Sequence, residues 1–329
     1  MDFKRIVQIG YKEFQDHITS LRFLALLFLM LTITEIFVFK EIGSYFEDLT
    51  KYGDSFGYSL FGLPKPMSIF GGIRTGIAGS SIFGSIIAIV LGFDLITKER
   101  ETGSIKAILS VPVYRDEVIN GKALGGIIAI VFAVTIVFVL TLGILFIYSI
   151  VPGLEEIGFI SVFWIITILY LVGIFVMSIM ISAFSKTSGI SFIYSLLIFL
   201  ILTSVTASTG SFAIDIILGP KPSANPDVMD SYDQEQYYEE VSAYTHRQLE
   251  LTNLVHYVSV DNNYNKVATA LTDPERYLWT TADEQKNSDY EPTLFDMLGR
   301  IWGYILFLIA YPIVFFGIAY VKFMRMDLR

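Results

Sequence analysis

Long apolar runs alternate with polar segments along the chain. A helix needs about 20 residues to cross the roughly 30 Å of hydrocarbon in a bilayer, and runs close to this length recur six times. They are continuous and rich in Leu, Ile, Val and Phe, without the alternation that a membrane β-barrel requires. The pattern therefore predicts six transmembrane helices at 23–39, 76–93, 123–150, 160–184, 190–206 and 301–321.

The segment before the first run has an amphipathic pattern. Apolar residues recur at helical spacing from Phe3 to Leu21, with charged residues such as Lys4 and Asp16 between them. This is typical of a helix that lies in the membrane interface. A signal peptide is the alternative, but its charged region would be too long and no small-residue cleavage site follows. We expect a retained interface helix over residues 1–22.

Positive charge is unevenly distributed among the connections. Of the 23 Lys and Arg residues, 13 fall in four segments of roughly 60 residues in total, which are 1–22, 94–122, 185–188 and 322–329. The other connections hold ten in more than twice that length. Because cytoplasmic connections are enriched in Lys and Arg, we expect a multi-pass protein of the plasma membrane with both termini in the cytoplasm.

The two long segments on the other side differ in composition. Segment 40–75 is rich in Gly and aromatic residues and contains Pro64 and Pro66. An irregular loop with one short helix is expected there. Segment 207–300 is acidic, because its residues 221–298 hold 15 Asp and Glu against five Lys and Arg, a net charge of −10 where the whole chain carries −9.

Within the acidic segment, residues 233–257 show helical spacing. One face carries Tyr237, Val241, Tyr244, Leu251 and Val255, interrupted by Gln248. A disordered acidic segment would have few such residues, so a mostly helical extracytoplasmic lobe is expected. Its tyrosines could form a ligand surface, although packing within the lobe is the favoured use. Copies of the lobe are expected to meet through the aromatic face, since acidic faces repel.

Composition excludes several classes of function. The chain is 53% hydrophobic and 17% charged, with a mean hydropathy of +0.59, which excludes a soluble enzyme. The absence of cysteine excludes disulfides and thiolate chemistry. His17, His246 and His256 have no second ligand at useful spacing, so no metal site is expected. Nothing resembles a polybasic nucleic-acid surface, so no nucleic-acid partner is expected.

The connection 94–122 is longer than a hairpin between two spans needs. The preceding helix can continue to Glu101 and stop at Gly103, since glycine is favoured at a helix C-terminus. Ser104 can then cap a short helix, and Asp116 can cap the helix that leads into the third span. The connection is therefore predicted to hold a short transverse helix at the cytoplasmic tips of two membrane helices.

The residues of this connection form a recognisable series. They are Glu99-Arg100-Glu101-Thr102-Gly103-Ser104, then Leu109-Ser110-Val111-Pro112, Tyr114-Arg115 and Gly121-Lys122. This series resembles the signature loop of ABC-2-type permeases, the membrane subunits of ATP-binding-cassette exporters, in the branch of NosY-like and of bacteriocin- or multidrug-export permeases. Residues 258–265 also resemble a Ser-Pro-x-x-x-Tyr segment of that family, with Val260 in place of Pro.

The resemblance implies a permease whose coupling helix, roughly 104–110, sits in a groove of a separate ATPase subunit. The docking residues it implies are Glu99, Arg100, Glu101, Ser104, Ile105, Lys106, Ile108, Leu109 and Arg115. Ile105, Ile108 and Leu109 offer an apolar ridge, and charged residues can pair at the rim. The alternative is a solvated charged loop whose apolar residues rest on the lipid interface.

The partners follow from the same resemblance. The chain has no G-x-x-x-x-G-K-[ST] loop, so it is not expected to be an enzyme and binds no cofactor of its own; ATP and Mg are expected on the ATPase. Two ATPase copies, a second copy of this chain in a homodimer, and membrane lipid are the expected partners.

Small residues of the second predicted span, Gly79, Ser80, Gly84 and Ser85, permit close helix contact or line a pathway or dimer face. Glu35, near the outer end of the first span, is costly in hydrocarbon unless it faces protein or reaches the surface. Reaching outward is favoured over a place on the substrate path.

The fold class expected is thus an all-α integral membrane protein with six transmembrane helices, an N-terminal interface helix and a mostly helical lobe before the sixth span. The divisions are 1–22, then 23–206 with the coupling loop 94–122, then 207–300 and 301–329. An exporter is the favoured function. The alternative is an ABC-type complex that transmits force to an extracytoplasmic partner, and an intramembrane enzyme is remote because no His lies within a span.

Overall fold

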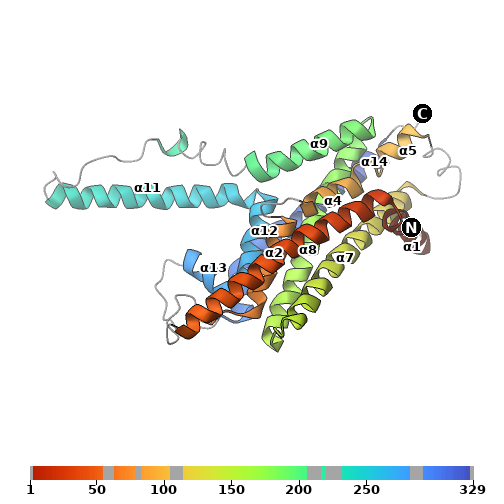
Figure 1. Ribbon diagram of the computed structural model, residues 1–329. Helices are drawn as coiled ribbons and strands as arrows, with labels where there is room; N and C mark the ends of the chain where they lie inside the picture. The colour runs from red at the N-terminus through yellow and green to blue at the C-terminus, as the bar shows by residue number, and fades with distance from the viewer. Residues whose placement is uncertain are drawn as a thin grey trace.

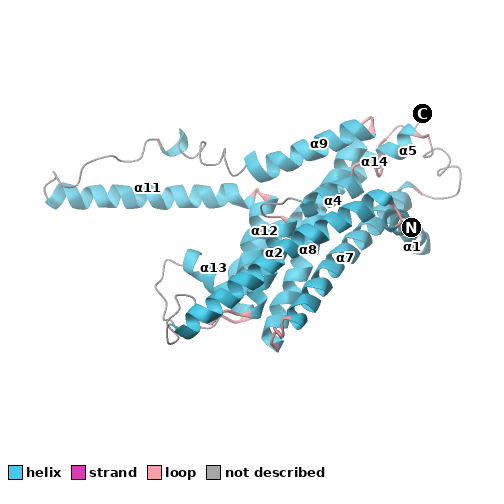
Figure 2. Ribbon diagram, in the orientation of Figure 1, coloured by secondary structure: helices cyan, strands magenta, loops and turns pink. Residues whose placement is uncertain are grey.

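The computed structural model describes residues 3–54, 63–78, 83–103, 114–205, 216–219, 231–281 and 292–326, and it is helical with no strand in those ranges (Figure 2). The helices are α1 Phe3–Ile18, α2 Leu21–Asp54, the 3₁₀ helix η1 Pro66–Phe70, α3 Gly71–Ile77, α4 Phe83–Gly92, α5 Thr97–Glu101, α7 Arg115–Ile147, α8 Leu154–Phe184, α9 Ser188–Leu200, the π-helix η2 Ile201–Val205, α11 Ser231–Tyr257, α12 Val260–Thr272, α13 Pro274–Thr281 and α14 Leu294–Met324. The predicted all-α class is confirmed.

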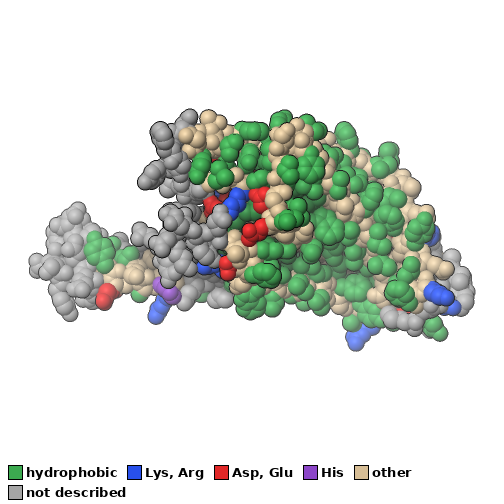
Figure 3. All heavy atoms as spheres, turned by 90° about the horizontal axis from the view of Figure 1, so that it is seen from below, with side chains coloured by type: hydrophobic (Ala, Val, Ile, Leu, Met, Phe, Trp, Pro, Cys, Tyr) green, Lys and Arg blue, Asp and Glu red, His purple; other side chains and the backbone are tan. Residues whose placement is uncertain are grey.

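Four of these helices, α2, α7, α8 and α14, are long and apolar enough to cross a membrane, within the residues that the structure describes. Helix α8 is central, since it packs against α4, α7, α12 and α14. Its side chains Phe163, Tyr170 and Phe175 are fully buried. By contrast, α7 and α14 expose large apolar side chains such as Val139 and Ile313. Apolar side chains cover most of the surface seen in Figure 3, as expected of a lipid-facing protein.

The predicted second span is not one helix in the described residues. Helix α3 ends at Ile77 and α4 begins at Phe83, and each is too short to cross a bilayer. Glycine explains the close packing here. A Cβ at Gly72 would lie 2.6 Å from the Val38 backbone nitrogen, and one at Gly76 would lie 2.7 Å from the Thr34 Cα. The fifth apolar segment, α9 with η2, is also short. The described residues therefore contain four long spans and not six.

Helix α2 is longer than the sequence indicates. An irregular loop was expected from residue 40 onward, but α2 continues to Asp54. Residues 40–54 contain no proline, and Lys51 pairs with Glu47 one turn earlier, 2.8 Å between Nζ and Oε1, which supports an exposed helix. The expected short helix is present as η1, which Pro66 begins.

The segment expected as a helical lobe is helical where it is described, but its helices have different surroundings. Helix α11 projects away from the bundle, whereas α12 packs against α8 and α14 (Figure 1). Ser259 caps α12 by accepting a hydrogen bond from the Asn262 amide at 3.2 Å. Val260 is thus the first helical residue, a position that also suits proline. The substitution of Val for Pro in the family segment therefore leaves this turn intact.

Candidate functional site

The two ends of the 104–113 connection lie beside both ends of the chain. The start of α1, helix α5 and the end of α14 gather at one end of the bundle (Figure 1). We call this the connection end. It joins the segments that the charge pattern assigns to one side of the membrane, and hydrogen bonds and ion pairs hold them together. The chemistry of this end follows from the side chains that make those bonds.

Lys122 is the centre of the connection end. It lies on the first turns of α7, is only 5% exposed, and forms ion pairs with Glu13 of α1 and with Glu99 of α5, the latter at 2.8 Å between Nζ and Oε1. A buried ammonium is tolerated when such partners compensate its lost hydration. One side chain therefore joins α1, α5 and α7.

Glycines on α7 allow α1 to approach closely enough for these pairs. A Cβ at Gly125 would lie 2.7 Å from the Gly10 carbonyl oxygen, and one at Gly121 would lie 2.6 Å from the Ile9 Cβ. Neither contact is tolerated by a real side chain without movement. The Gly121-Lys122 pair of the signature thus has a structural role, since the glycine admits α1 and the lysine binds its carboxylate.

The start of α7 differs from the sequence prediction. Asp116 was expected to cap this helix, but α7 begins at Arg115 and its N-cap residue is Tyr114. The fully buried Glu117 accepts a hydrogen bond from the Tyr114 amide at 3.2 Å, and Arg5 of α1 lies 3.7 Å from the same carboxylate. Glu117 takes the capping role instead of Asp116, because its carboxylate binds the Tyr114 amide and also pairs with Arg5 of α1. Asp116 lies in the first turn, where a carboxylate is also favourable.

Two arginines bind the C-terminal ends of membrane helices. Arg100 donates to the Ser185 carbonyl at 2.8 Å, just after α8, and to the Met326 sulfur at 2.7 Å. Arg115 donates to the Met326 carbonyl at 2.9 Å. The last carbonyls of a helix have no partner within the helix and attract cations. The two flanks of the connection are thus both attached to the end of α14.

Glu101 joins α5 to the start of α9. It accepts hydrogen bonds from the Ser188 hydroxyl at 2.7 Å and from the Ser188 amide at 3.0 Å, and these bonds lower the pKa of the Glu101 carboxyl. Helix α5 ends just before Gly103, whose φ is +69°, so the predicted glycine stop is confirmed. The preceding helix does not continue to it as expected, because α4 ends at Gly92 and α5 is a separate short helix.

The predicted docking residues therefore divide into two groups. Glu99, Arg100, Glu101 and Arg115 are described, and all four bind groups within this chain. The others, Ser104, Ile105, Lys106, Ile108 and Leu109, lie outside the described residues. The docking of an ATPase at any of these positions stays a prediction.

His17 lies on α1 close to this network. Burial lowers the pKa of its imidazole, while the carboxylates of Glu13 and Asp94 act in the opposite direction. Burial also raises the pKa of Asp94, which lies 3.7 Å from Arg22. Sequence reasoning assigned no role to His17 and missed its place beside the Lys122 network, because nothing local in the sequence brings α1 onto α7.

The small residues of the second predicted span lie partly in the described structure. Gly79 and Ser80 fall outside the described residues. Gly84 and Ser85 are buried within this chain, and the Ser85 and Tyr170 hydroxyls are 2.9 Å apart. Tyr170 also donates to Asp261 of α12 at 3.2 Å. A role for these residues on a pathway or dimer face stays a prediction.

Glu35 does not reach outward as the sequence favoured. Its side chain is buried against α7 and accepts a hydrogen bond from the Thr141 hydroxyl at 3.2 Å. The expectation of a surface position was wrong, because α2 presents this residue to protein and not to lipid. Facing protein is the other way to tolerate a carboxylate at this depth.

Comparison with known proteins places the chain in a family. A family model described as ABC-2 family transporter protein matches residues 7–328, nearly the whole chain. A search of curated proteins finds no match. The matched region includes both flanks of the 104–113 connection and the helices attached to them. The chain therefore belongs to the ABC-2 transporter family, whose members are the membrane permease subunits of ABC transporters, and the four long apolar helices of the described ranges agree with that role.

Proposed function

We propose that this chain is the permease subunit of an ATP-binding-cassette exporter and that it converts ATP hydrolysis by a separate ATPase subunit into movement of its membrane helices. Membership of the ABC-2 family supports the permease role. Two copies of the chain and two of the ATPase complete the transporter. Residues 76–93 and 190–206 form the second and fifth membrane passes, and both termini lie in the cytoplasm.

The observation that carries this proposal is the attachment of both flanks of the 104–113 connection. On one side, α5 is bound to α7 and α1 through Lys122 and to α9 through Glu101. On the other, Arg115 is bound to the end of α14. Removing one partner of a buried ion pair costs about 3–5 kcal/mol. A push on the connection therefore moves these helices together instead of deforming the loop alone.

Coupling of this kind needs a contiguous set of rigid contacts between the site of force and the helices that move. The connection end supplies one, because its contacts join α1 to α7, α5 to α7 and α9, and both flanks of the connection to the end of α14. Arg100 donates hydrogen bonds to residues just after the C-terminal ends of both α8 and α14. ATPase closure under the connection would thus reach α7, α8, α9 and α14 through these contacts.

A substitution in the connection tests this function. Leu109→Asp puts a carboxylate into a desolvated docking groove, which costs a few kcal/mol, and should abolish co-purification of the ATPase or its stimulation. Leu154→Asp is the matched control, because Leu154 is 91% exposed at the start of α8, far from the connection. Co-purification and stimulated ATP turnover equal to those of the control would disprove docking at this helix.

A further inference from the structure

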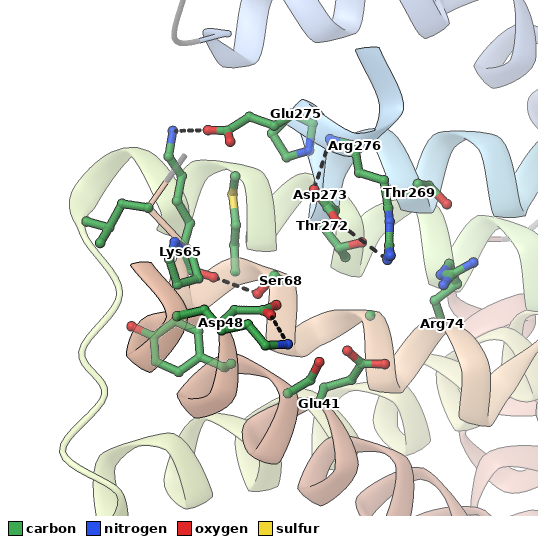
Figure 4. Close-up of a pocket in the computed structure, with 18 residues that line it drawn as sticks. Glu41, Asp48, Lys65, Ser68, Arg74, Thr269, Thr272, Asp273, Glu275 and Arg276 are labelled. Atoms are coloured by element: carbon green, nitrogen blue, oxygen red, sulfur yellow. Dashed lines mark hydrogen bonds and ion pairs between the residues drawn. The ribbon is translucent and has the colours of Figure 1, made fainter. Parts of the chain in front are cut away.

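A pocket lies far from the connection end, between α2, the start of α3 and the α12–α13 corner (Figure 4). Its volume is about 350 Å³, within the usual range for small-molecule sites. Figure 3 shows acidic and basic side chains gathered in a hollow on the underside of the molecule, where the rest of the surface is mainly apolar. Charged groups are costly on an otherwise apolar membrane surface, so their concentration here indicates a function.

The charges around the pocket are balanced. Its lining includes four carboxylates and four basic side chains. Three of the basic groups lie near carboxylates: Lys65 is 3.5 Å from Glu275, Arg276 is 3.9 Å from Asp273, and Lys51 is 3.8 Å from Asp48. A balanced lining favours neither a simple anion nor a simple cation, because each would meet as much repulsion as attraction.

Two opposite charges in this lining remain without a hydrogen bond or ion pair. Glu41 of α2 and Arg74 of α3 are both partly buried, and the Arg74 Nε is shielded from solvent without a hydrogen-bond partner. Figure 4 shows both on the lower wall of the pocket, with Asp273 and Arg276 opposite. A shielded donor without a partner costs about 1–3 kcal/mol. An anion bound at Arg74 would remove that cost.

The depth of the pocket indicates where its occupant comes from. Glu41 follows the apolar stretch 23–39 of α2. At about 1.5 Å per residue, this stretch spans about 26 Å, close to the thickness of the hydrocarbon layer. Glu41 therefore lies at the level of the lipid headgroups, and Arg74 lies slightly deeper, because the glycines on either side of it pack against residues 34–38 of α2. The exposed side chains of Phe39 and Phe46 lie on the same helix as Glu41.

We propose that this pocket binds phosphoethanolamine, a zwitterion with a primary ammonium and a phosphate, as the headgroup of an ethanolamine phospholipid. Arg74 donates hydrogen bonds to the phosphate, since a guanidinium matches two phosphate oxygens at once. Glu41 accepts hydrogen bonds from the ammonium. Burial raises the pKa of the neighbouring Asp273, and a second cation nearby would favour its charged form. The site does not depend on coupling to an ATPase.

Binding of radiolabelled phosphatidylethanolamine to the full-length protein in detergent micelles tests the proposal. We expect saturable binding that falls at least about tenfold in both Glu41→Gln and Arg74→Gln, the loss of roughly one charged contact. Lys40→Gln is the matched control, because Lys40 is exposed on the same helix and does not line the pocket; the affinity of this variant should stay within about twofold. Phosphatidylcholine, which lacks ammonium hydrogens, and phosphatidylglycerol, which lacks the cation, should bind more weakly.

Free O-phosphoethanolamine distinguishes the two sources of this chemistry. Competition at millimolar concentration would show that the headgroup is sufficient, whereas binding of the lipid without such competition would show that the acyl chains are also required. Equal affinity for all three lipids, or affinity in both substituted proteins equal to that of the unsubstituted chain, would overturn the proposal. So would the absence of saturable binding of either probe. Thermal unfolding without lipid checks that each variant is folded. If Arg74→Gln does not fold, the affinity of Glu41→Gln alone tests the proposal.

Discussion

The connection end and the outer pocket use charged side chains in opposite ways. At the connection end, Lys122 is nearly inaccessible and has two carboxylate partners. In the pocket, Arg74 is shielded at its Nε and has no hydrogen bond. Paired buried charges hold helices in one arrangement, whereas a shielded donor without a hydrogen-bond partner is stabilised by a ligand that accepts its hydrogen. The first region is therefore suited to transmitting movement and the second to receiving a ligand.

The largest expected effect is at Lys122. Lys122→Met leaves Glu13 and Glu99 without their shared cation and should lower the free energy of unfolding by about 3–5 kcal/mol, measured by thermal or denaturant unfolding in detergent. Lys98→Met is the control, because Lys98 is exposed on the neighbouring helix. Adding Glu13→Gln and Glu99→Gln should restore part of the loss. A Lys122 variant as stable as its control would contradict the conclusion that Lys122 holds α1, α5 and α7 together at the connection end.

A smaller loss is expected from Gly125→Ala. The new Cβ would lie 2.5 Å from the Glu13 Cβ and would push α1 away from α7, at a cost of about 1–3 kcal/mol. Gly143→Ala on the same helix meets nothing within 4 Å and should be neutral or slightly stabilising. Faster proteolysis of the α1 segment in the first variant, but not in the second, would locate the effect.

In contrast, Arg74→Met should change the unfolding free energy by less than about 1 kcal/mol in lipid-free detergent, because the loss of attraction to Glu41 is offset by removal of a shielded donor without a partner. Thermal or denaturant unfolding in detergent measures this change, as for Lys122→Met. A loss as large as that of Lys122→Met would show that Arg74 is a structural ion-pair partner, and the contrast between the two regions would then fail.

The smallest effect concerns pH and Glu101. Hydrogen bonds from Ser188 hold the folded-state pKa of this carboxyl below its ordinary value of 4.5. Glu101 therefore stabilises the fold above that pH, and the contribution is lost as pH falls through the lower, folded-state value. Ser188→Ala should be slightly less stable than the unsubstituted chain at pH 7, and the difference should shrink as the pH falls below 4.5. The control Ser161→Ala should show no such dependence, since Ser161 only bonds to its own helix.

Local patterns were sufficient to predict much of the structure. The amphipathic spacing after Phe3 predicted α1, the apolar runs predicted α7, α8 and α14, and Gly103 predicted the end of α5. Helix formation and helix ends depend mainly on neighbouring residues, because the bonds involved reach only four positions along the chain. The signature of the connection pointed to the family for the same reason, since its residues are contiguous.

Local sequence patterns thus predict an all-helical membrane chain and single out the connection 94–122 by its length and residues. The tertiary structure alone decided which faces meet. Tyr264 of α12 stacks on Tyr170 of α8, with 4.3 Å between the ring centroids, although 94 positions separate them. Likewise, the burial of Lys122 depends on α1, and the inward side chain of Glu35 depends on α7. Pairing between distant segments depends on shape and on the desolvation of both partners, which no local pattern records.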